Sequence, residues 1–458
     1  MTHKNETSIL VAALLITLAI IGGAYWLWSK KIQPQTTSQF PTTLDLNTRI
    51  SDGKTILVPG IDNEAKLFAA KAIAEGNNAK ATQLLTDYLQ KYPNDPEAQI
   101  YLNNLQSLDH NPLKIALVLS VDNLNIGQEM LRGAAQAQTE INKKGGINQR
   151  HLHITIANDS NEPKIAEQVA QTLINKPEII AVVGHNASNA SVAAAPIYQE
   201  GQMVMVNPTS NDNGISDIGD HIFRVVTNNS SAAKSLAENF QKYNRQVVVC
   251  YDFQSSDSVS FQQDFVSNLL AMGGQQAPVI CNLSDPTFDP KAKIQEAISK
   301  GADSLLLIPH IDHLDKAYQL AKINQGKLRL YGSNTLATIK TLQQGKTVHR
   351  LTLPVSWNPK TTENFPFGQA ARQRWGGDVS WRTAGTYDAT TVVATGLQTN
   401  PTRQGLQQTL SQPTFVSQTL NGKVNFLPNG DRAYNAIVVQ VKPSSDHQTG
   451  YDFFPLSP

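Results

Sequence analysis

The sequence contains few cysteines and few charged residues. Cys250 and Cys281 are its two cysteines in 458 residues, too few for a dense disulfide scaffold, and they form no CxxC pair of the kind that binds zinc. Lysine plus arginine (38) nearly balances aspartate plus glutamate (37), and charged residues make up 16% of the chain, against about 25% in typical soluble domains. A net charge of +1 gives no general attraction to phosphate backbones, so we do not expect nucleic acid as a partner.

Motifs of catalysis and metal binding are also missing. The sequence has no G-x-S-x-G and no H-E-x-x-H. Residues 345–347 read Gly-Lys-Thr, but Lys340 stands where a phosphate-binding loop requires glycine. The His- and Asp-rich stretch 310–315 has no second group of ligands to join it, which favours a polar loop and helix start over a metal site. We therefore expect neither an enzyme nor a cofactor or metal.

The first thirty residues predict a membrane anchor. Ile9 to Trp28 is a run of twenty uncharged residues followed by Lys30 and Lys31, and as a helix it would reach about 30 Å, one hydrocarbon thickness. Its end, residues 23–26, lacks the small-residue site at which a signal peptide is cleaved. We expect residues 1–30 to remain as a single transmembrane helix, and residues 31–61 to form a linker with at most one strand.

Residues 62–110 predict a small helical segment. Leu67, Ala70 and Ile73 recur at helical spacing, and Pro93 ends a second apolar stripe before Asp95 opens a third helix. The spacing of about 34 residues resembles one and a half tetratricopeptide repeats. A plain helical hairpin packed on the next domain explains the pattern equally well, because fewer than three repeats rarely stand alone.

From residue 113 onward, short apolar runs alternate with amphipathic helical stretches. The runs are continuous rather than alternating, as expected of strands covered by helices on both faces. This order predicts an α/β fold with parallel, doubly wound sheets, and about 330 residues require two such lobes. The predicted strands are 114–121, 152–157, 179–183, 203–206, 247–251, 278–281, 304–308 and 328–331.

Several segments in fixed order resemble the leucine/isoleucine/valine-binding family of periplasmic solute receptors, the type I binding-protein fold. They are Ile141-Asn142-Lys143-Lys144-Gly145-Gly146-Ile147, then Gly184 to Ser188, then Phe223-Arg224, Tyr387-Asp388-Ala389 and 422–432. The resemblance covers about 113–442. It implies a first lobe of 113–228 and 356–413 and a second of 229–355 and 414–442. Three crossovers near 227–230, 353–357 and 412–416 would join the lobes, followed by a tail at 443–458.

The resemblance also implies a ligand-binding site between the lobes. Ser188 follows a strand and opens a helix, so its hydroxyl and the free amides of the helix start can hold a carboxylate. Thr209 and Ser210 match the hydroxyl-bearing loop that closes this site in the family. By their local sequence alone these residues would be an ordinary N-cap and a turn.

Other positions depart from the family pattern. The family holds an α-ammonium group with acidic residues, and Asn229 and Asn334 stand at the matching places. The ligand is therefore expected to be an amino acid or a related compound, including one without an ammonium group. Asp257 could still supply a negative charge. Ile126 replaces an aromatic residue of the cleft, and His310 follows a strand where the family places cleft residues.

The resemblance predicts a receptor that closes around a small polar ligand, as the binding component of an ABC-type importer with a permease as partner. The alternative is a sensory or scaffold protein, in which the same body detects a ligand and the helical segment contacts a signalling partner. Either function places the body in the periplasm or outside the cell, although Lys30 and Lys31 lean slightly the other way. Cys250 and Cys281 end neighbouring strands, and we expect two buried thiols rather than a disulfide.

Overall fold

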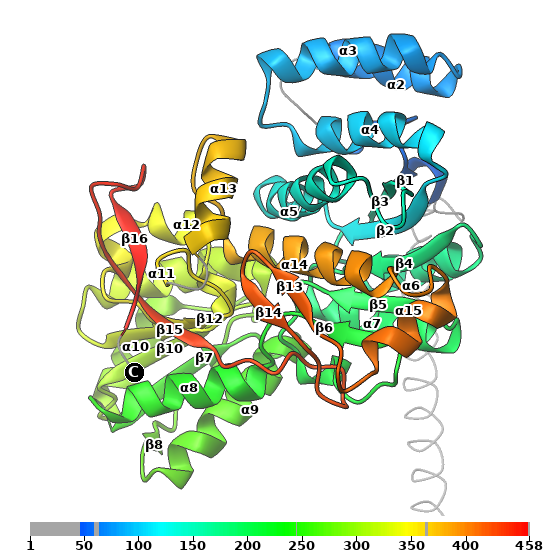
Figure 1. The fold of residues 1–458 in the computed structure, drawn as a ribbon. Helices are drawn as coiled ribbons and strands as arrows, with labels where there is room; N and C mark the ends of the chain where they lie inside the picture. The colour runs from blue at the N-terminus through cyan, green and yellow to red at the C-terminus, as the bar shows by residue number, and fades with distance from the viewer. Residues whose placement is uncertain (1–45, 59–63, 244, 362–364, 457–458) are drawn as a thin grey trace, which may run out of the picture. The chain divides into compact units, whose positions relative to one another are not determined.

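The computed structural model describes residues 46–58, 64–243, 245–361 and 365–456. The predicted anchor and most of the predicted linker lie outside these ranges. Within them, no helix combines the length and the apolar character needed to cross a membrane. Residues 47–458 form one compact unit, built on two large β-sheets (Figure 1).

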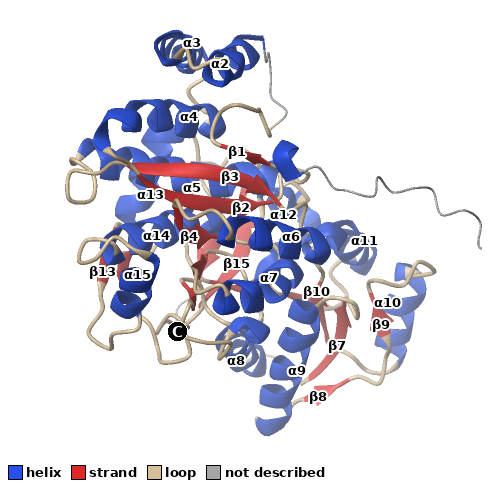
Figure 2. Cartoon of the chain, turned by 90° about the vertical axis from the view of Figure 1, so that its right-hand side faces the viewer, coloured by secondary structure: helices blue, strands red, loops and turns tan. Residues whose placement is uncertain are grey.

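The first sheet has the strand order β1-β3-β2-β4-β5-β6 and defines what we call the first lobe. Its short edge strand β1 is antiparallel to β3, and the other strands are parallel. The central strands are buried almost throughout, because helices cover both faces (Figure 2). The strands are β1 (Ile50–Ser51), β2 (Leu113–Leu119), β3 (Leu152–Asn158), β4 (Ile179–Val183), β5 (Val204–Asn207) and β6 (Ile222–Arg224).

The second sheet has the order β16-β15-β12-β11-β10-β7-β8, with β9 also beside β7, and defines the second lobe. Strands β7 to β12 are parallel, whereas β15 and β16 run antiparallel at one edge. The strands are β7 (Gln246–Tyr251), β8 (Gln275–Gln276), β9 (Cys281–Asn282), β10 (Ser304–Ile308), β11 (Arg329–Gly332), β12 (Thr352–Val355), β15 (Ile437–Pro443) and β16 (Tyr451–Pro455). The prediction of two doubly wound lobes is confirmed, except that both sheets carry antiparallel edges.

Helices connect these strands and cover the sheets. The pair α5 and α14 packs so closely that a Cβ atom at Gly133 of α5 would lie 2.3 Å from the backbone oxygen of Thr383 in α14. The helices that follow the helical segment are α5 (Leu124–Lys143), α6 (Pro163–Ile174), α7 (Ser188–Glu200), α8 (Asn229–Gln241), α9 (Ser256–Ala271), α10 (Pro290–Ser299), α11 (Leu314–Asn324), α12 (Ile339–Leu342), α13 (Phe365–Trp375), α14 (Trp381–Gly396) and α15 (Arg403–Leu410).

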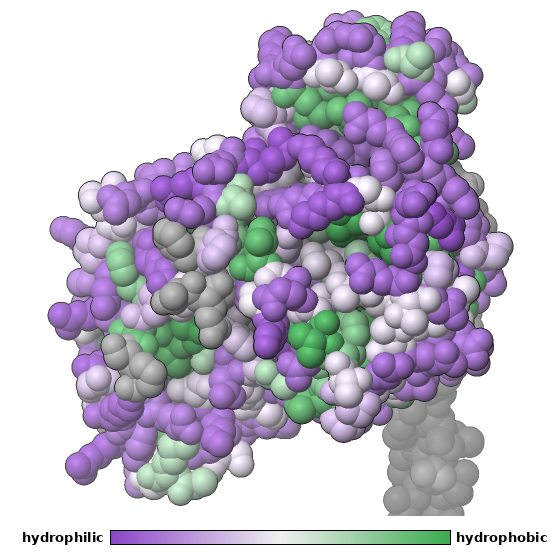
Figure 3. Space-filling model, in the orientation of Figure 1, coloured by the Kyte–Doolittle hydropathy of each residue, from purple (hydrophilic) through white to green (hydrophobic). Residues whose placement is uncertain are grey.

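The helical segment consists of α2 (Glu64–Ala74), α3 (Asn78–Lys91) and α4 (Pro96–Ser107). Asp95 caps α4 by accepting from the Ala98 amide at 2.9 Å. Helix α4 lies between the α2–α3 pair and α5 (Figure 1), and Asn104 exchanges two hydrogen bonds, of 2.8 and 2.9 Å, with the backbone of Ile154 in β3. On the face drawn in Figure 3, a band of hydrophobic residues lies within this helical layer. These contacts agree with a hairpin packed on the first lobe, and the tetratricopeptide resemblance stays a prediction.

The C-terminal part of the chain differs from the expected boundaries. The hairpin of β13 (Ser417–Thr419) and β14 (Gly422–Val424) packs against α14 of the first lobe, although it was expected in the second. Asp431 then pairs with the buried Arg224 at the end of β6, which holds the chain on the first lobe beyond 412–416. The third crossover therefore lies between Asp431 and β15. The predicted tail also forms β16, whose five residues pair with β15.

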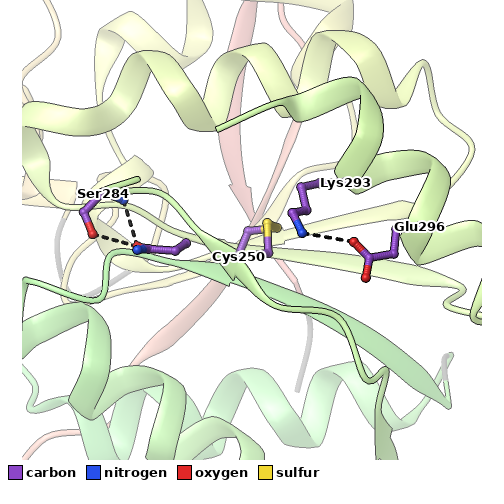
Figure 4. Close-up of a disulfide and its surroundings, with 6 residues drawn as sticks. Cys250, Ser284, Lys293 and Glu296 are labelled. Atoms are coloured by element: carbon purple, nitrogen blue, oxygen red, sulfur yellow. Dashed lines mark hydrogen bonds and ion pairs between the residues drawn. A yellow bond between two sulfur atoms is a disulfide. The ribbon is translucent and has the colours of Figure 1, made fainter. Parts of the chain in front are cut away.

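The prediction of two free thiols was wrong, because Cys250 and Cys281 form a disulfide. The two residues stand opposite each other in the pairing of β7 with β9, with their Cα atoms 4.6 Å apart (Figure 4). That separation lies inside the range that a disulfide can bridge. The predicted strand 278–281 was also misplaced: Pro278 has no N–H for the ladder, and β9 begins at Cys281.

Candidate functional site

Both lobes present the same topological feature to each other. In each sheet the chain first adds strands on one side of its first parallel strand and then continues on the other side. The two directions part between β2 and β4 in the first lobe and between β7 and β10 in the second. Ligands of open α/β sheets bind at the carboxyl ends of the strands at this point. Ser188 follows β4, Asp257 follows β7 and His310 follows β10. The fold therefore brings these three residues to a common site between the lobes.

A small cavity of about 30 Å³ lies at this site, close to the volume of one water molecule. A larger outer cleft of about 1050 Å³ adjoins it, and Ile311, Trp381 and Arg382 lie in the walls of both. The cavity is lined by Asn186, Ala187, Ser188, Thr209, Asn211, Asp257, His310, Ile311, Asn334, Thr335, Trp381 and Arg382. Five of the eight predicted site residues are among them.

Ser188 is the first residue of α7. The preceding N-cap residue is Ala187, which has no side-chain group to bond the first amides of the helix. Those backbone donors and the partial positive charge of the helix end favour an anion. Ser210 donates from its hydroxyl to the Ser188 hydroxyl at 2.9 Å. Ser210 therefore orients the Ser188 side chain, and it does not line the cavity itself.

Thr209 has a structural task in addition to lining the cavity. Its hydroxyl contacts the backbone oxygens of His185 and Asn186 at 3.1 and 2.9 Å. These bonds hold the loop after β5 against the loop after β4. Because the hydroxyl has only one hydrogen to donate and uses it on the backbone, Thr209 is not free to donate to a ligand in this arrangement.

Asp257 supplies the carboxylate that the two asparagines lack. The side chain of Asn229, which is fully buried, donates to the Asp257 Oδ1 atom and to its backbone oxygen, each at 3.0 Å. Burial and the nearby negative charge of Asp212 raise the pKa of Asp257 to about 6, while hydrogen bonds from Asn229, Ser188 and Thr335 oppose the rise. At neutral pH Asp257 is a buried anion in contact with the first lobe, and it can pair with a cation.

Asn334 and His310 add neutral polar groups. Asn334, in the short 3₁₀ turn Asn334–Leu336, donates to the Asn211 Oδ1 atom at 2.7 Å, while its own buried Oδ1 has no partner. Burial lowers the pKa of His310, and its Nδ1 atom accepts from the Asp312 amide at 3.3 Å. Its Nε2 atom is buried without a partner. Both side chains therefore keep one unused atom for a ligand.

Ile126 lies apart from these residues. It stands in the first turn of α5 and lines only the outer cleft, together with Trp357 and Lys340. Ile126 was predicted as a ligand-binding residue, but it does not line the small cavity.

Sequence reasoning missed Asn211, Trp381 and Arg382. Asn211 directly follows the predicted pair Thr209 and Ser210, so extending that loop by one residue would have found it. Trp381 and Arg382 begin α14, and they lie 46 and 47 residues after Thr335, the nearest other lining residue in the sequence. The available signal was an aromatic residue and a cation directly after Ser380, whose side chain caps the helix by accepting from the Arg382 amide at 3.2 Å.

The model of the family described as "Periplasmic binding protein" matches residues 117–448. The leucine-, isoleucine-, valine-, threonine- and alanine-binding protein of Pseudomonas aeruginosa is 30% identical over 155 residues, which are 32% of this chain and 41% of that protein. The Leu/Ile/Val-binding protein of Escherichia coli is 34% identical over 100 residues, 21% of this chain and 27% of that protein. The chain thus spans less than half the length of these curated relatives.

Solved structures give a longer match. A leucine-binding protein of Thermotoga maritima has a TM-score of 0.66 at 20% identity, covering 76% of this chain and 99% of that one. At this identity the likeness concerns the fold. The family match spans well over half of the sequence, and its named relatives are binding proteins, in line with the expectation that this chain is not an enzyme. The chain belongs to the periplasmic binding protein family.

Proposed function

We propose that the chain is an extracytoplasmic receptor for an amino acid, acting as the solute-binding component of an ABC-type importer. The observation that carries the proposal is the meeting of Ser188 and Asp257 across the cavity. A helix start with a hydroxyl suits an α-carboxylate, and a buried carboxylate suits an α-ammonium. These two groups belong to different lobes, so a ligand that contacts both stabilises closure.

Asp257 changes the expectation drawn from Asn229 and Asn334. A buried ammonium group needs a counter-charge, and Asp257 provides one directly beside Asn229. The two asparagines are therefore no longer a reason to expect a ligand without an ammonium group. The names of the curated relatives, which bind aliphatic amino acids, point in the same direction.

The test is calorimetric titration of the full chain with the twenty common amino acids. Ser188→Ala and Asp257→Asn should each weaken the best ligand at least tenfold. Asp87→Asn, an exposed carboxylate on α3, is the matched control and should bind like the parent chain. Equal affinity in all four proteins, or no heat with any amino acid, would overturn the proposal.

The compartment and the anchor are part of the proposal. A structural disulfide between Cys250 and Cys281 suits an oxidising compartment such as the periplasm. Residues 9–28 would tether the body to the cytoplasmic membrane. A reporter fused after Pro458 should be active outside the cytoplasm, and activity confined to the cytoplasm would refute this orientation.

The alternative is a ligand-sensing receptor. It is favoured by one observation: α4 of the helical segment is hydrogen-bonded to β3 of the first lobe, so the segment moves with that lobe on closure. Uptake of a radiolabelled ligand by cells with and without the gene separates the two functions. Uptake lost with the gene supports import, whereas unchanged uptake with intact binding supports sensing.

A further inference from the structure

Arg382 is a buried cation at the border between the inner cavity and the outer cleft. The residue is 4% exposed, and its guanidinium lies 4.4 Å from the ring centroid of Trp381. Its Nη1 atom donates to the Ala337 backbone oxygen over a long 3.4 Å, and its Nε atom is buried without a partner. Such an incompletely bonded guanidinium is costly to bury.

None of the described acidic side chains forms an ion pair with this guanidinium. Glu129 and Asp257 act on it only through their charge at a distance. Glu129 is already bonded to Arg132 at 2.7 Å and to the Ser380 amide at 2.8 Å. Asp257 is bonded to Asn229 and is the proposed partner of the ligand's ammonium. Burial lowers the pKa of Arg382 to about 10, which still leaves it charged at neutral pH.

We infer that Arg382 is an anion subsite of the same cavity, and that the ligand is an amino acid with a carboxylate in its side chain, such as glutamate or aspartate. The inference rests on the proposed function: Ser188 and Asp257 hold the two groups on the α-carbon, and the side chain extends toward Arg382, which lines the same cavity. The planar fork of a guanidinium suits a carboxylate, and the apolar walls at Ile311 and Trp381 suit the intervening methylene groups.

The experiment compares L-glutamate with L-glutamine, which differ by a charge at nearly constant shape. Calorimetric titration of the full chain at pH 7.5 should show glutamate binding at least tenfold tighter. In Arg382→Met the glutamate affinity should fall at least tenfold, with glutamine changing less than threefold. Arg382→Lys should keep part of the preference, because it keeps the charge but not the fork.

Arg374 offers a matched control. It is also partly buried, has an unpartnered Nε atom and lies 4.9 Å from the ring centroid of the neighbouring Trp375, but it lines a groove outside the cavity. Arg374→Met should leave the preference for glutamate unchanged.

The outcomes separate this inference from the proposed function. If glutamine or leucine binds as tightly as glutamate, while Ser188→Ala and Asp257→Asn still weaken binding, the anion subsite is refuted and the receptor stands. Equal losses of glutamate and glutamine in a folded Arg382→Met protein would make Arg382 structural and also refute it. If that protein does not fold, a weakened preference for glutamate in Arg382→Lys decides for the inference, and an unchanged preference decides against it. Absence of binding by every amino acid refutes the proposed function itself.

Discussion

Ligand affinity should fall as the pH is lowered through the pKa of Asp257. That pKa is raised to about 6 because the carboxyl group is buried and faces the charge of Asp212. Only the ionised form can pair with a ligand's ammonium. At pH 7.5 nearly all of the free protein is ionised, whereas at pH 5 about one molecule in eleven is, so the dissociation constant should rise about tenfold.

The free protein should respond in the opposite direction. A carboxyl group whose pKa is higher in the folded than in the unfolded chain destabilises the fold where it is ionised, and protonation below about pH 6 relieves this. Relative to Asp257→Asn, the ligand-free parent should therefore become more stable between pH 7.5 and pH 5. Calorimetric titration measures the affinity, and thermal unfolding measures the stability.

Two other groups near Asp257 need controls. Arg382 remains charged over this range, because its pKa is about 10. Burial lowers the pKa of His310, and His310→Gln is the control for this side chain: it should keep the pH dependence of binding. Asp257→Asn should remove it. A parent protein with constant affinity from pH 7.5 to pH 5, or an Asp257→Asn protein with an unchanged slope, would refute the reasoning.

Three further outcomes are expected. Ser188→Ala should weaken the ligand at least tenfold, which is about 1.4 kcal/mol or more, with little change in the unfolding midpoint, and unchanged affinity would contradict the assignment. Replacing both Cys250 and Cys281 by alanine should lower the free energy of unfolding by roughly 3 to 4 kcal/mol, given their sequence separation of 31, and denaturant titration of the two proteins measures this. Glu97→Gln should destabilise the fold by about 3 kcal/mol, because the fully buried Lys66, 2.7 Å from Glu97, loses a counter-charge; an unchanged melting temperature would contradict this.

The strands that sequence reasoning found are those buried on both faces. The runs 179–183 and 304–308 coincide with β4 and β10, in which every residue except the partly exposed Ile180 is buried. Strands β15 and β16, at one edge of the second sheet, were missed because they are partly exposed and carry polar residues. Strand β12 lies inside that sheet and is buried, but it was missed as well, since it contains Pro354. Their place is decided by pairing with distant segments, which local composition does not encode.

The site was predictable where its residues follow strands. Ser188, Asp257 and His310 were found because strand ends in such sheets converge, whereas Arg382 belongs to the start of a helix whose position depends on the packing of α14 against α5. The sequence also could not show that Asn229 positions a carboxylate and that Asp257 supplies it, because this depends on their contact in the folded chain. In sequence, an asparagine replaces an expected acid; in the structure, that asparagine holds an aspartate in its place.

The described conformation is already closed by the protein's own contacts, and this limits what a ligand can contribute. Asn334 reaches Asn211 at 2.7 Å, and the Ser256 hydroxyl reaches Asn189 at 2.8 Å, both from the second lobe to the first. A cavity of about 30 Å³ cannot hold an amino acid, so the lobes must separate before a ligand enters. The ligand then gains only the difference between its bonds to Ser188 and Asp257 and the direct bonds that it displaces. Because Asp257 is costly to keep ionised and unpaired by a cation, an ammonium group gains most from that exchange, and a neutral ligand gains least.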